Sequence, residues 1–167
     1  MRAPQEHLVE SLKSKVESMV VDMHKSNILG GVISLLALAL CILIFVFRLN
    51  GMPVVERGLG IVFLCTGIPF FYLLLGAKML HRQRLYYIQL GAILTFIVLE
   101  MFLDYAFQID FRHIKWLTIV YVMFFFAGTG GLIGIASQAG KNWTYAAIFL
   151  FLLMTALAFW QRAKTGM

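Results

Sequence analysis

Five long apolar runs constrain the fold of this chain more than any other feature of its sequence. They lie at residues 27–47, 59–79, 85–106, 116–137 and 143–160. Each run is close to the length of about 20 residues with which a helix crosses roughly 30 Å of hydrocarbon. Because hydrocarbon supplies no partner for free backbone N–H and C=O groups, each run is expected to be helical. We therefore predict an all-α fold, a polytopic transmembrane helix bundle with about five spans.

Composition and charge agree with a location in the lipid bilayer. Apolar residues make up 61% of the chain and charged residues 13%, which is more apolar surface than a soluble domain of this length can bury. The net charge of +6 is spread over every loop without a basic stripe, so nucleic acid is not expected as a partner. Lys and Arg are slightly more numerous on the side of the N-terminus. We expect a bacterial-type inner or plasma membrane, with the N-terminus in the cytoplasm.

The segment before the first run has the pattern of an amphipathic helix. Its apolar residues are spaced three and four apart, which places them on one stripe: Val9, Leu12, Val16, Met19 and Met23. Acidic and basic residues off the stripe nearly cancel, so attraction to anionic lipid would be slight. We interpret the segment as a docking helix for a second copy or another protein, with the membrane interface or disorder as alternatives. The predicted organisation is a cytoplasmic or interfacial helix over 1–26, a five-helix bundle over 27–161 and a short polar tail over 162–167.

Two carboxylates interrupt the end of the third run. Glu100 and Asp104 are four residues apart, so a helix would place them on one face. An ionised acid at mid-bilayer depth costs about 2.5–3.5 kcal/mol, so Glu100 needs a partner, a proton or water. A charged hairpin follows and supplies candidate partners: Asp110, Arg112, His113 and Lys115. We interpret the group as a salt-bridge clamp between the third and fourth spans, with a proton or cation site of Glu100, Asp104 and His113, or a surface for a charged subunit, as alternatives.

Small residues dominate the end of the fourth run, which reads "AGTGGLIGIAS". Gly130 and Gly134 form a GxxxG pattern that Gly131 widens, and such a face lets another helix backbone approach closely. This partner helix could belong to the same chain or to another. In the second run, Gly67 and Pro69 predict a kink, since proline removes a helical hydrogen bond.

Catalytic and cofactor-binding motifs are not found in this sequence. The four histidines have no HExxH spacing, and neither a CxxC nor a GxSxG motif is present. We assign no catalytic residue and expect neither a metal nor a cofactor. The sequence favours a non-enzymatic subunit or assembly partner that acts through helix packing, either as a homo-oligomer or with another membrane protein. A small proton- or cation-coupled transporter or channel using Glu100 and Asp104 is the main alternative, and a lipid-modifying membrane enzyme is the third.

Overall fold

The chain folds into a bundle of long helices. The computed structural model describes residues 3–107 and 115–165, and within these ranges the regular structure is entirely helical. The helices are α1 (Ala3–Leu49), α2 (Pro53–Cys65), α3 (Gly67–Met79), α4 (Arg84–Glu100), the π-helix η1 (Met101–Ala106), α5 (Lys115–Ser137) and α6 (Lys141–Thr165). The predicted all-α bundle is therefore confirmed.

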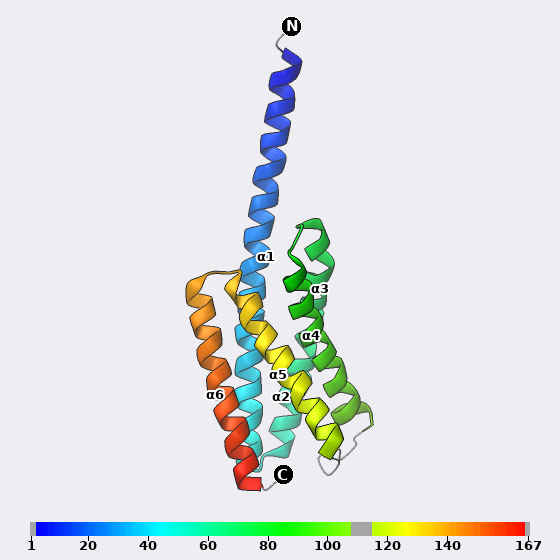
Figure 1. The fold of residues 1–167 in the computed structure, drawn as a ribbon, viewed down its shortest axis with the longest axis vertical. Helices are drawn as coiled ribbons and strands as arrows, with labels where there is room; N and C mark the ends of the chain where they lie inside the picture. Colours follow the sequence, from blue (N-terminus) through cyan, green and yellow to red (C-terminus); the bar gives the residue numbers. More distant parts are fainter. Residues whose placement is uncertain (1–2, 108–114, 166–167) are drawn as a thin grey trace.

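Five helical segments are long and apolar enough to cross a membrane, as the sequence predicted. They run over Lys13–Leu49, Pro53–Met79, Arg84–Ala106, Trp116–Ser137 and Lys141–Lys164. Successive spans alternate in direction, so the bundle has two ends (Figure 1). We call the end with the α3–α4 and α5–α6 turns the arm end, because the N-terminal part of α1 projects from it. The end with the α1–α2 turn and the C-terminal part of α6 is the far end.

Two of the spans depart from a regular α-helix. The second span is interrupted at Thr66, whose backbone N–H donates to the carbonyl of Phe63, three residues back. Pro69 has no N–H with which to continue the ladder, so the interruption lies close to the predicted kink at Gly67 and Pro69. The third span changes into the π-helix η1 directly after Glu100. Single π-helical turns of this kind often occur at functional sites.

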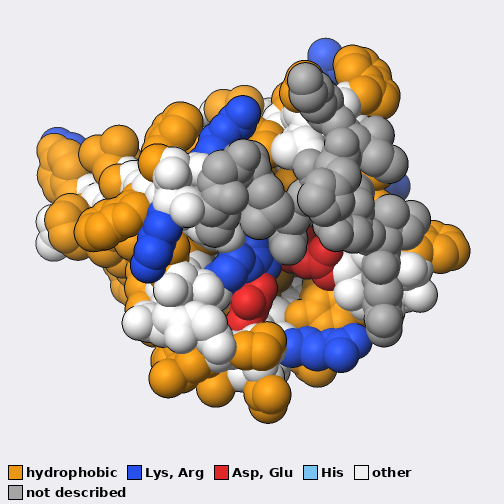
Figure 2. All heavy atoms as spheres, turned by 90° about the horizontal axis from the view of Figure 1, so that it is seen from below, with side chains coloured by type: hydrophobic (Ala, Val, Ile, Leu, Met, Phe, Trp, Pro, Cys, Tyr) orange, Lys and Arg blue, Asp and Glu red, His pale blue; other side chains and the backbone are white. Residues whose placement is uncertain are grey.

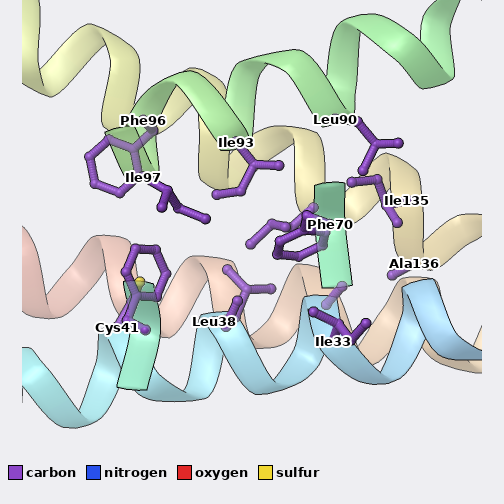
Figure 3. Close-up of a cluster of buried hydrophobic side chains, with 14 of the residues drawn as sticks. Ile33, Leu38, Cys41, Phe70, Leu90, Ile93, Phe96, Ile97, Ile135 and Ala136 are labelled. Atoms are coloured by element: carbon purple, nitrogen blue, oxygen red, sulfur yellow. The ribbon is translucent and has the colours of Figure 1, made fainter. Parts of the chain in front are cut away.

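The centre of the bundle is a largely apolar core. α1 packs against α2, α5 and α6, while α4 packs chiefly on α5. Figure 3 shows Leu38 on α1 facing Ile93 on α4, and both side chains are fully buried. Aromatic side chains extend the core toward the far end, with the Phe96 ring 6.0 Å from that of Phe63 and 5.4 Å from that of Phe125. Edge-to-face pairs of this kind stabilise a core beyond the area that they bury.

α1 is much longer than a membrane crossing requires. Its 47 residues give a helix of about 70 Å, against roughly 30 Å of hydrocarbon. The helix passes residue 26 without interruption, so the predicted N-terminal helix and the first span form one element. Its N-terminal part rises past both turns of the arm end (Figure 1). We call residues 3–22 the arm, and every side chain from Lys13 to Asp22 is exposed.

Candidate functional site

Charged side chains gather at the far end of the bundle. Figure 2 shows acidic side chains beside basic ones in the middle of this end. At the end of α1, Arg48 donates from both Nε and Nη2 to Oε1 of Glu56 on α2, each at 2.5 Å. Both side chains are 23% exposed, so the ion pair lies at the rim of the apolar core. It joins the two helices across the short turn that connects them.

Glu100 belongs to the same cluster. The hydroxyl of Tyr121 on α5 donates to Oε2 of Glu100 at 2.5 Å. The charge of Arg48 interacts electrostatically with Glu100, in addition to its ion pair with Glu56. The half-buried Glu100 therefore lies among side chains from α1, α2 and α5, and the polar cluster connects four helices of the bundle. A guanidinium among carboxylates can hold helices together, and a half-buried carboxylate can also take up a proton or a cation.

Asp104 lies one turn beyond Glu100, on the π-helix. Its charge and that of Glu100 both interact with Tyr121 and with Tyr105. The Tyr105 hydroxyl donates to the backbone carbonyl of Arg57 at 3.1 Å, which attaches η1 to the first turns of α2. Glu100 and Asp104, which the sequence predicts on one face of a helix, therefore interact with the same two tyrosines.

The partners that the sequence predicts for Glu100 in the charged hairpin stay a prediction. Asp110, Arg112 and His113 lie outside the described residues, and so does the side chain of Lys115, whose backbone begins α5. Among the described residues, Arg48 is a cation that interacts with Glu100, and it was not among the candidates from the sequence. The sequence could have indicated Arg48, because the first span ends on the same side of the membrane as the third.

The glycine-rich face of α5 is used unevenly. An added Cβ at Gly131 would lie 3.1 Å from the backbone carbonyl oxygen of Gln89 on α4, and one at Gly134 would meet the Gln89 side chain. A Cβ at Gly128 would lie 3.3 Å from the carbonyl oxygen of Ala92. At Gly130, in contrast, no atom lies within 4 Å of the added Cβ. The glycines that pack against α4 are therefore Gly128, Gly131 and Gly134, which are three residues apart. Of the GxxxG pair, Gly134 contacts α4 and Gly130 does not.

The apolar stripe of the arm has no cover over most of its described length. Val16 is 60% exposed and Met19 38%, whereas Met23 is half-buried where α1 enters the bundle. The side chains of Val9 and Leu12 lie outside the described residues. A docking role for this stripe stays a prediction.

A second polar contact ties the base of the arm to the α3–α4 turn. Arg82 donates from Nη2 to the side-chain oxygen of Asn27 and, at 3.5 Å, to the backbone carbonyl of Met23. Its guanidinium also lies over the ring of Tyr86, 4.9 Å from the ring centre, in a cation–π contact. Arg82 of the α3–α4 turn therefore holds α1 at the point where the arm leaves the bundle.

Neither metal chemistry nor a known relative assigns a role to these features. Among the described residues, no group of three or more His, Cys, Asp or Glu side chains is arranged to hold a metal ion. Comparison with known protein families, curated proteins and solved structures finds no match.

Proposed function

We propose that this protein is a small integral membrane subunit that assembles with other polypeptides through helix packing and performs no catalysis itself. The observation that carries the proposal is the exposed arm of α1. A single helix of this length is marginally stable in water, so a partner that covers its apolar stripe would stabilise it. Burying a Val or Met side chain contributes about 1.5–3 kcal/mol, and Val16 and Met19 are both available for burial.

Deletion of residues 1–22 tests this proposal. The bundle should remain folded, because the side chains from Lys13 to Asp22 are exposed and support no part of the core. Native mass spectrometry after extraction in a mild detergent should show that the full chain carries bound polypeptides at a fixed ratio and that the deletion variant has lost them.

Paired substitutions on the arm separate the apolar stripe from the arm as a whole. Val16→Asn with Met19→Asn should release the bound polypeptides. Ser14→Asn with Ser18→Asn introduces the same polar groups on the other face and serves as the matched control. An unchanged assembly in the deletion variant would refute the proposed function.

The proposal includes the orientation and the membrane. We propose that the arm lies in the cytoplasm of a cell with a bacterial-type inner or plasma membrane, because the α3–α4 turn beside it is the densest short basic segment. The cytoplasm is also where a soluble or peripheral partner could reach the arm.

Transport is the second candidate function, and the gathering of Glu56, Glu100 and Asp104 around the far end favours it. In this hypothesis Glu100 exchanges a proton or a cation while Arg48 balances the charge that remains. Glu100→Gln should then abolish pH- or cation-dependent flux in reconstituted vesicles. Flux that is equal in the variant and the original protein would remove Glu100 from this role and leave the clamp interpretation.

A further inference from the structure

The arm's apolar stripe lies on the same side of α1 as the face that α1 buries in its own bundle. Residues of an α-helix advance by about 100° each, so positions seven apart nearly coincide in direction. Met23 is seven residues before Gly30, which is packed against α3, α4 and α5, and Val16 lies seven further back. Since α1 is continuous, the stripe faces the space above the arm end of the bundle (Figure 1).

The opposite face of α1 is exposed in the membrane-crossing part and polar in the arm. Leu29, Val32 and Leu36 are exposed in the membrane-crossing part and face away from the bundle. Continued into the arm, this direction meets the polar residues Ser18 and Lys25. The arm therefore places its polar side over the surrounding lipid and its apolar side over the bundle.

Basic side chains gather at the arm end, below the apolar stripe, and we call this group the basic floor. Its two turns carry exposed or half-buried basic side chains: Lys78, His81, Arg82, Arg84 and Lys141. No Asp or Glu stands between residues 67 and 99 or between 111 and 167, so the helices joined by these two turns add no acidic side chain to this end. Arg82 joins this floor to the base of the arm through its contacts with Asn27 and Met23. The apolar stripe of the arm and these basic side chains therefore meet at the contacts of Arg82, and we call this region the corner.

Within residues 3–107 and 115–165, no other segment of the same chain reaches this corner. The C-terminal part of α6 lies at the far end (Figure 1). The arm of a second copy in the same membrane would emerge from its own bundle, at least a bundle's width away. Residues 1–25 of that copy, the arm with the residues next to it, also carry four acidic and four basic side chains, so they offer no net charge to a basic floor. Lipid headgroups could neutralise the floor, but Val16 lies about 50 Å along α1 from Leu49, which exceeds the roughly 40–45 Å of a bilayer with its headgroups.

From these observations we infer that the corner between the arm and the bundle is a docking site for an acidic amphipathic helix of another protein. The helix packs its apolar face on Val16, Met19 and Met23 and directs its carboxylates to Lys78 and Arg84 on the floor. This inference rests on the proposed function, since it names the kind of partner that the arm binds and where it binds. Helix-in-groove recognition combined with charge complementarity is a common way to reach such specificity.

Site-specific photo-crosslinking in the native membrane tests the inference. A photoreactive amino acid at Met19 probes the stripe, and the same probe at Ser18 is the matched control on the adjacent lipid-side face. We expect the Met19 probe to capture a different polypeptide whose crosslinked segment, mapped by mass spectrometry, is an acidic amphipathic helix. Capture of a second copy, of lipid alone or of no molecule, or equal capture from both positions, overturns the inference.

Charge reversal tests the floor separately. Lys78→Glu with Arg84→Glu should lower the yield of the Met19 crosslink about tenfold, because like charges then face the acidic helix. Arg57→Glu at the far end is the control and should leave the yield unchanged. An equal yield in the floor variant overturns the role of the basic turn.

The two proposals fail in different ways. If deletion of the arm leaves the assembly intact, both are wrong. If deletion dissolves the assembly but the crosslink maps to a second copy or to the Ser18 side, the proposed function stands and the acidic-helix inference is wrong.

Discussion

Arg48 should matter more to the stability of the bundle than either of its acidic neighbours. Arg48 forms an ion pair with Glu56 at 2.5 Å and also interacts electrostatically with Glu100. Arg48→Gln leaves both acids without this cation. Glu56→Gln leaves Arg48 with Glu100 and removes only one of the two attractions. The two variants should therefore differ in the free energy of unfolding.

The size of the effect follows from the burial of the pair. Breaking a fully buried pair by removing one partner costs about 3–5 kcal/mol, whereas an exposed pair is worth at most about 1 kcal/mol. With both side chains 23% exposed, we expect roughly 2–3 kcal/mol for Arg48→Gln and about 1–2 kcal/mol for Glu56→Gln. For a chain of this size that corresponds to a fall in Tm of about 4–12 °C and about 2–8 °C, respectively.

The chain supplies its own probe for the measurement. Cys41 is buried in the core whereas Cys65 is exposed, so in a Cys65→Ser background a fluorogenic thiol reagent reacts only as the bundle unfolds. Thermal scans in detergent would compare Arg48→Gln and Glu56→Gln with Arg57→Gln, an exposed arginine at the same end. A Tm for Arg48→Gln equal to that of the Arg57 variant, or above that of Glu56→Gln, would refute the bridging role.

Two further predictions use the same assay. Gly131→Ala should lower the free energy of unfolding by about 1–3 kcal/mol, because its Cβ would press on the Gln89 backbone, whereas Gly130→Ala meets nothing and should be neutral or stabilising. Equal effects at the two glycines would contradict this contact. Tyr121→Phe keeps the ring against Phe96 but loses the hydrogen bond to Glu100, so it should cost about 1.5–3 kcal/mol. The exposed Tyr145→Phe is its control, and an equal change in both tyrosine variants would contradict the prediction.

The helices of this protein were predictable because the signal for each lies within its own sequence. An apolar run of about 20 residues has one stable form in hydrocarbon, so the number of spans and their helical state follow from length and composition. The interruption of the second span could also be predicted, since Pro69 removes a hydrogen bond wherever the helix packs.

Which residues contact one another between the helices could be learned only from the tertiary structure. The alternation of spans already puts the end of the first beside the end of the third, but only the rotation of α1 about its axis decides that Arg48 approaches Glu100. The same is true of the glycines, where Gly131 meets Gln89 and Gly130, one residue away, meets nothing. Hydrophobic periodicity specifies which residues leave water, whereas the register between helices depends on how all the side chains fit together. The sequence by itself therefore determined a five-span helical membrane protein, and the packing of those helices decided which charges and which glycines meet.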